Sequence, residues 1–109
     1  MPFAFEKLIV YQKAVAFADA CCSLTRVFPR GYFFLADQLN RAALSIAANL
    51  AEGNGRFTKP DRKNFFGIAR GSVQECVLVL EVARRLTCWR QDSIRDLAEM
   101  TRSPYWSTI

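Results

Sequence analysis

Apolar residues recur at intervals of three and four along most of this 109-residue chain, whereas the alternation typical of half-buried strands is missing over any useful length. That spacing predicts helices over about residues 5–27, 32–52, 60–86 and 92–101, followed by a tail over residues 103–109. Helices with wide apolar faces and short connections favour an all-α, antiparallel up-down-up-down four-helix bundle with a short fourth helix. We expect residues 1–109 to form one domain.

Local signals mark where the helices begin and end. Phe28 and Pro29 break the first helix, because proline disfavours helical geometry in the residue before it. The Gly53-Asn54-Gly55 segment is expected to end the second helix through residues that accept positive φ. Thr58 starts the third helix as a cap, and Pro60 suits the first helical turn.

Two glycines interrupt the interior of the third helix. Gly67 and Gly71 lie four residues apart on one face, and each costs about 1 kcal/mol relative to alanine there. Close approach to another backbone would offset that cost. The expected partners are the small residues of the second helix, Ala43, Ala47 and Ala51.

Polar residues form a stripe along the second helix at steps of three or four. Its members are Gln38, Arg41, Ser45, Asn49 and Glu52. The stripe either faces water or forms a hydrogen-bonding seam with a facing helix, to which Ser72 and Glu75 would contribute.

The positive charge is concentrated in one part of the chain. The net charge is +5, and between Arg41 and Arg70 six basic residues against Glu52 and Asp61 leave +4 of it. Such a cluster either is a solvated face or contacts phosphates, where lysine and arginine gain affinity from counterion release. The candidate nucleic-acid contacts are Arg41, Arg56, Lys59, Arg62, Lys63 and Arg70.

The composition argues against most catalytic chemistry. Histidine is absent, which removes the usual general base and the commonest metal ligand, so we expect no metal and no cofactor. Glu52 and Glu75 are expected to pair with Arg41 and Arg70 rather than to act as a catalytic pair. The four cysteines match no zinc or redox spacing and are expected to be reduced, apolar helix residues: Cys21, Cys22, Cys76 and Cys88.

Neither a secretory leader nor a long apolar run is visible in the sequence. Residues 1–6 lack a basic start and a cleavage site, and no stretch approaches the roughly 20 consecutive apolar residues of a membrane span. We therefore expect a cytoplasmic protein without a membrane association, which agrees with reduced cysteines.

A combination of motifs over about residues 5–86 resembles a known family. The motifs lie in residues 5–8, 11–14, 28–29, 38–46, 49–53, 55–56, 65, 68–72 and 75. They are similar to the four-helix bundle proteins encoded in intervening sequences of 23S ribosomal RNA genes. The same family includes proteins similar to the accessory variability determinant of diversity-generating retroelements, which works beside a reverse transcriptase and RNA.

The resemblance implies a left-handed bundle that assembles into a ring-shaped homopentamer with a basic surface, without an established biochemical activity for most members. It favours a structural or inter-subunit role for the polar stripe. One departure is that family members usually continue the fourth helix well past Pro104, so a different assembly or an exposed apolar strip is expected here.

Two functions follow as hypotheses. The first is a non-enzymatic homo-oligomer that contacts RNA or DNA backbones through its basic surface. The alternative is a protein-interaction adaptor, for example accessory to a reverse transcriptase, which rests on the retroelement relatives and on Tyr105 and Trp106 near the C-terminal end. An enzyme ranks third.

Overall fold

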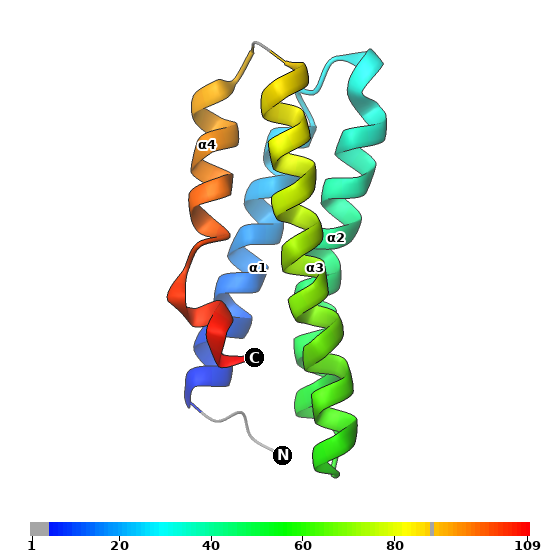
Figure 1. Cartoon of the computed structure of the whole chain (residues 1–109), viewed down its shortest axis with the longest axis vertical. Coiled ribbons are helices and arrows are strands. Elements are labelled where there is room, and N and C mark those ends of the chain that lie inside the picture. The colour runs from blue at the N-terminus through cyan, green and yellow to red at the C-terminus, as the bar shows by residue number, and fades with distance from the viewer. Residues whose placement is uncertain (1–4, 88) are drawn as a thin grey trace.

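The computed structural model describes residues 5–87 and 89–109. Four helices run antiparallel along the long axis of a molecule measuring 45 × 21 × 18 Å (Figure 1). They are α1 (Phe5–Thr25), α2 (Phe33–Asn54), α3 (Lys59–Leu86) and α4 (Gln91–Met100), with two 3-10 helices, η1 (Arg30–Tyr32) and η2 (Pro104–Thr108). No strand occurs in the part of the chain that the structure describes. The prediction of an all-α four-helix bundle with a short last helix is confirmed.

The observed helices begin and end within two residues of the predicted bounds. At the start of α3 the Thr58 hydroxyl accepts a hydrogen bond from the Asp61 backbone N–H at 3.3 Å, and proline occupies the first turn. The prediction of positive φ at the end of α2 is wrong. Gly55 has a φ of −81°, and among the described residues no glycine has positive φ.

One apolar core joins all four helices. The largest fully buried side chains include Phe17 of α1, Leu39 and Ile46 of α2, Leu80 of α3 and Ile94 of α4. Removing each such side chain from water contributes roughly 1.5–3 kcal/mol. The most extensive helix pair is α2 with α3, and α1 packs mainly on α2.

Helix α1 is the most apolar segment. Its Leu8–Thr25 stretch has a mean hydropathy of 1.2, so by length and composition it could cross a membrane, a property that core helices of soluble proteins share. In the bundle the inner face of α1 contributes to the core, since Val10, Ala14 and Cys21 are completely buried.

The expected close packing at Gly67 and Gly71 is wrong within this chain. Both glycines are exposed, and a Cβ added to either would meet no atom within 4 Å. Of the expected alanine partners, Ala43 is buried, Ala47 is half-buried and Ala51 is exposed.

Close approach occurs instead at Gly53, which is buried in the last turns of α2. A Cβ there would lie 2.6 Å from Cε1 of Phe66 and 3.1 Å from Cβ of Phe65. The glycine that meets another helix is therefore the one that sequence reasoning assigned to a turn.

The C-terminal segment is not a tail. Trp106 of η2 is only 8 % exposed, its ring meets Phe17 edge to face at 6.4 Å, and its indole N–H donates to the carbonyl of Met100 at 2.9 Å. Ile109 is also buried. Figure 1 shows η2 alongside α1 beyond the end of α4, where Trp106 covers part of the apolar face of α1.

Replacing the buried indole tests this packing. Trp106→Ala should lower the free energy of unfolding by about 3–5 kcal/mol, because a large cavity opens against α1. Phe57→Ala, at an 86 % exposed position, should change it by less than about 0.5 kcal/mol. Urea denaturation followed by circular dichroism measures both. If Trp106→Ala lowered the free energy of unfolding by no more than Phe57→Ala does, the packing of η2 would be contradicted.

The glycines provide a second test of the fold. Gly53→Ala should lower Tm, because overpacking against Phe66 costs about 1–3 kcal/mol and the helix propensity of alanine returns at most about 1 kcal/mol. Gly67→Ala should raise Tm, since the added methyl meets open space and alanine favours the helix. Thermal unfolding of both variants at low protein concentration checks that the two changes in Tm have opposite signs. Changes in Tm of equal sign would refute the α2–α3 geometry.

Candidate nucleic-acid interface

The turn between α2 and α3 is held in one conformation by hydrogen bonds. The backbone N–H of Gly55 donates to the carbonyls of Ala51 and Glu52 at 3.2 and 3.1 Å. From the other side, Nη1 of Arg62 donates to the carbonyls of Arg56 and Phe57, at 3.1 and 3.0 Å. Arg62 therefore clamps the turn onto α3.

Arg56 is also engaged within the protein. Its Nη2 lies 3.1 Å from Oε2 of Glu52, and its guanidinium carbon lies 4.6 Å from the centroid of the Phe65 ring. Both members of the ion pair are well exposed, so the pair contributes only about 0.5 kcal/mol. Two of the six predicted contacts thus shape the turn, although their charges remain at the surface.

Lys59 and Lys63 lie in the first turns of α3 and are exposed. Within residues 5–87 and 89–109 neither lysine has an ion-pair partner. Together with Arg70 they follow one edge of α3 at steps of four and seven residues. Arg70 differs from the lysines, because its guanidinium donates a hydrogen bond to the main-chain oxygen of Ile109. Phe57, in the turn itself, is 86 % exposed.

Arg41 lies apart from this cluster. It is exposed on α2, and 13 residues at about 1.5 Å per residue place it roughly 20 Å from the end of that helix. The structure therefore brings together Arg56, Lys59, Arg62 and Lys63 at one end of the bundle, extends them along α3 to Arg70, and leaves Arg41 outside.

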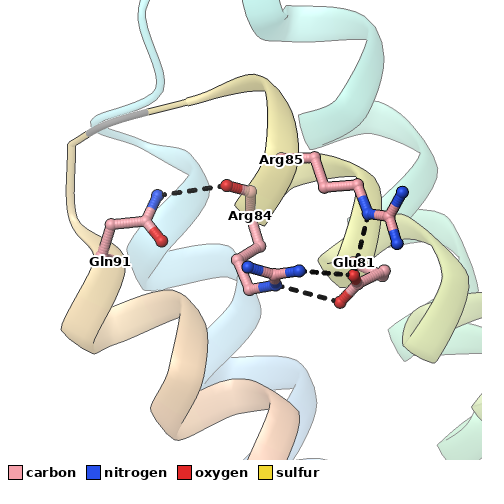
Figure 2. A network of polar contacts seen from close by, with 4 residues as sticks. All are labelled: Glu81, Arg84, Arg85 and Gln91. Carbon is pink, nitrogen blue, oxygen red and sulfur yellow. Dashed lines mark hydrogen bonds and ion pairs between the residues drawn. The ribbon is translucent and has the colours of Figure 1, made fainter.

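Four arginines along α3 and α4 are paired with carboxylates: Arg84, Arg85, Arg95 and Arg102. Figure 2 shows Glu81 between Arg84 and Arg85, at 2.7 and 3.0 Å, with Gln91 donating to the Arg84 carbonyl at 3.4 Å. Hydrogen bonds from Arg84, then Arg85, lower the pKa of Glu81 from 4.5 to about 2. Because the folded-state pKa is lowered, the stabilisation is present above pH 4.5 and is lost as the pH falls toward 2. Two further ion pairs neutralise arginine charges at and just after α4: Arg95 with Asp92, and Arg102 with Glu99.

Sequence reasoning missed a second basic group at the opposite end of the bundle. Arg26, Arg30 and Arg90 are exposed and have no ion pair with any residue that the structure describes. They come from the end of α1, from η1 and from the α3–α4 connection, so no local sequence window contains them. The nearby rings of Phe28 and Trp89 pack against each other at 4.9 Å.

Part of the polar stripe bridges α2 and α3. Ser72 Oγ donates to Ser45 Oγ at 2.8 Å, and the amide Nδ2 of Asn49 donates to the carbonyl and hydroxyl oxygens of Ser45 at 2.8 and 3.0 Å. Gln38 and Arg41, farther along the stripe, are exposed. The central members of the stripe thus form a small hydrogen-bonded link.

The expected pairing of carboxylates with Arg41 and Arg70 is wrong. Glu52 pairs with Arg56 instead, one helical turn away, and Arg70 bonds to Ile109. Glu75 is exposed and has no ion pair with a described residue.

Of the cysteines that the structure describes, Cys21 and Cys76 are buried and Cys22 is half-buried. Cys21, Cys22 and Cys76 are free thiols, whereas Cys88 lies outside the described residues. Burial raises the pKa of Cys21 and raises that of Cys76 to about 12, which disfavours the reactive thiolate. Among the described residues no three Cys, Asp or Glu side chains gather in a group suited to a metal ion.

A groove of about 480 Å³ lies between α3 and α4. Val77, Leu80 and Ile94 contribute apolar surface to it, and the paired side chains Arg84 and Glu81 lie at its edge. Its polar groups are already engaged with one another.

Comparisons with known proteins agree with this architecture. No curated protein matches the chain. A crystal structure of a protein with unknown function from the S23 ribosomal protein family of Bacteroides thetaiotaomicron superposes with a TM-score of 0.70. The two chains are 21 % identical over 93 % of this chain and 98 % of the other, a level of identity that shows the fold alone. The model of the 23S rRNA-intervening sequence protein family matches residues 6–103, nearly the whole chain, and the protein therefore belongs to that family.

Proposed function

We propose that this protein is a non-enzymatic, cytoplasmic, oligomeric module that binds the phosphate backbone of nucleic acid through its α2–α3 turn. The observation that carries the proposal is the pair of exposed, unpaired lysines, Lys59 and Lys63, at the start of α3. Because these ammonium groups have no carboxylate partner among the described residues, no ion pair has to break before they contact phosphates.

The distribution of charge supports this end of the molecule. From Glu52 to Arg70 five basic residues against two acidic residues give +3 of the net charge of +5. By contrast, Arg84, Arg95 and Arg102 have carboxylate partners. A local excess of positive charge attracts polyanions and releases their counterions on binding.

The turn is also pre-organised. The Arg62 clamp and the Thr58 cap fix the backbone that carries the cations. Binding therefore does not have to order a flexible loop, a cost that would reduce affinity.

Self-association is supported by apolar side chains on the outer faces of α2 and α3. Leu44, Ile68 and Leu78 are 54, 45 and 63 % exposed. On α3 the open positions of Gly67 and Gly71 lie on the same face as Leu78, so another helix can approach closely there. The homopentamer implied by the family resemblance is our proposed assembly, and it would multiply the number of basic turns per particle.

The structure removes the sequence argument for the alternative, a protein-interaction adaptor. That argument relied on exposed aromatics near the C-terminal end, yet Trp106 is buried against α1 and Tyr105 is half-buried. A protein partner such as a reverse transcriptase would have to contact another surface.

Neutralising the two lysines tests the nucleic-acid contact. We expect Lys59→Ala/Lys63→Ala to weaken binding to RNA and DNA alike, and to reduce the slope of log K against log salt by about one per lysine. Fluorescence anisotropy of labelled 20-mers between 50 and 300 mM KCl measures both quantities. The matched control is Arg26→Ala/Arg30→Ala, which removes the same charge at the opposite end of the bundle. Salt-independent binding, or an equal loss in the control, would refute the assignment.

Placing a charge on the outer face of α3 tests the assembly. Leu78→Glu should reduce the mass in solution to the 12.4 kDa of a single chain, because a carboxylate would be buried in the proposed interface. Light scattering after size exclusion measures the mass, with Arg30→Glu as the control that keeps it. A monomeric wild-type protein, or an unchanged mass for Leu78→Glu, would exclude this interface.

A further inference from the structure

We infer that the α2–α3 turn selects single-stranded nucleic acid, with the ring of Phe57 as the surface on which an unpaired base stacks. This inference rests on the proposed function and gives that site a preferred substrate. Its basis is an uncovered aromatic ring on a fixed backbone, with unpaired cations next to it in the chain.

Phe57 is the most exposed large apolar residue that the structure describes, at 86 %, compared with 56 % for Phe34. Isolated apolar side chains on a surface are common and need no explanation by themselves. The surroundings of Phe57 distinguish it from such cases.

The backbone on both sides of the ring is fixed. The carbonyl of Phe57 accepts from Arg62 at 3.0 Å, and the next residue, Thr58, caps α3 through the N–H of Asp61. The preceding residue, Arg56, also accepts from Arg62 through its carbonyl. The aromatic side chain therefore projects from a rigid turn, and stacking on it does not require loop ordering.

Two of the aromatic rings near this turn, those of Phe65 and Phe57, differ in what covers them. The guanidinium of Arg56 lies over the ring of Phe65, at 4.6 Å from its centroid, so that ring already has a cation on one face. No ring or cation contact with Phe57 occurs among the described residues, which leaves both faces of its ring accessible.

The cations stand where a nucleic-acid backbone would pass. Lys59 follows Phe57 by two residues, and Lys63 lies one helical turn beyond it on the same face of α3. Proteins that bind single strands without sequence preference combine these same two elements, a basic track for the backbone and aromatic side chains for the bases.

A duplex cannot use the ring in this way. Its bases are stacked on one another and paired, so only its phosphates are available to the turn. Lys59 and Lys63 therefore contribute to both kinds of substrate, whereas Phe57 contributes only to single strands.

The opposite end of the bundle makes a weaker candidate. Phe28 is buried, and the surface hollow that Phe33 lines contains both Arg26 and Asp37, so its two charges offset each other and give no net attraction for phosphates. This end supplies the matched control for the test.

The experiment compares Phe57→Ala, Phe57→Trp and the control Phe34→Ala in the full chain. The probes are fluorescein-labelled U20 RNA, dT20 DNA and a 20-base-pair DNA duplex at 100 mM KCl. Phe57→Ala should weaken binding to both single strands by roughly 5- to 150-fold, the range for losing one base–aromatic stack. Duplex binding and the salt dependence should not change, because no cation is removed. Phe57→Trp should restore single-strand binding, and Phe34→Ala should have no effect.

The outcomes separate this inference from the proposed function. Equal loss on duplex and single strands, or no loss with Phe57→Ala while Lys59→Ala/Lys63→Ala weakens binding, would overturn the stacking role and leave the backbone contact intact. Absence of salt-sensitive binding to every probe by the wild-type protein would overturn both. Circular dichroism of Phe57→Ala excludes misfolding as the cause of a loss.

Discussion

The close contact between α2 and α3 is the constraint on which the rest of the structure depends. At one end of the pair the ring of Phe66 occupies the space that a side chain at position 53 would fill, and near its middle Ser72 donates to Ser45. A glycine and a short hydrogen bond between small hydroxyls both bring the helix axes together. This pair offers the surface on which α1 packs, and α4 and η2 complete the core.

The same pair determines where the basic cluster lies. Helix α3 has 28 residues and α4 only 10, so α4 covers one part of α3 and leaves the α2–α3 turn beyond its reach (Figure 1). The turn is thus an end of the hairpin that α4 does not cover. Its conformation is set by contacts within the hairpin itself, chiefly the Arg62 clamp and the Thr58 cap, and not by the rest of the bundle.

The sequence was sufficient for the features that depend on local spacing. Apolar periodicity located the four helices, and Thr58 marked the start of α3, because these signals act within a few residues. Features that depend on a distant partner were not predictable. The sequence favoured a turn for Gly53 and a helix contact for Gly67, yet the position of Phe66 makes Gly53 the glycine that meets another helix. Likewise, Pro104 predicted a break, but the burial of η2 depends on space left beyond α4.

The number of cations in the sequence does not show how many of them are available to contact a ligand. Arg56, Arg62 and Arg70 each donate hydrogen bonds within the protein, so their planar donor groups are partly committed to structure. The remaining candidate contacts at the turn, Lys59 and Lys63, are flexible point charges with strong hydration. The planar guanidinium of arginine suits specific recognition through two parallel hydrogen bonds. The ammonium group of lysine, on a flexible side chain, binds phosphates along a nucleic-acid backbone without contacting the bases. This division between structural arginines and available lysines fits a site that tolerates many sequences.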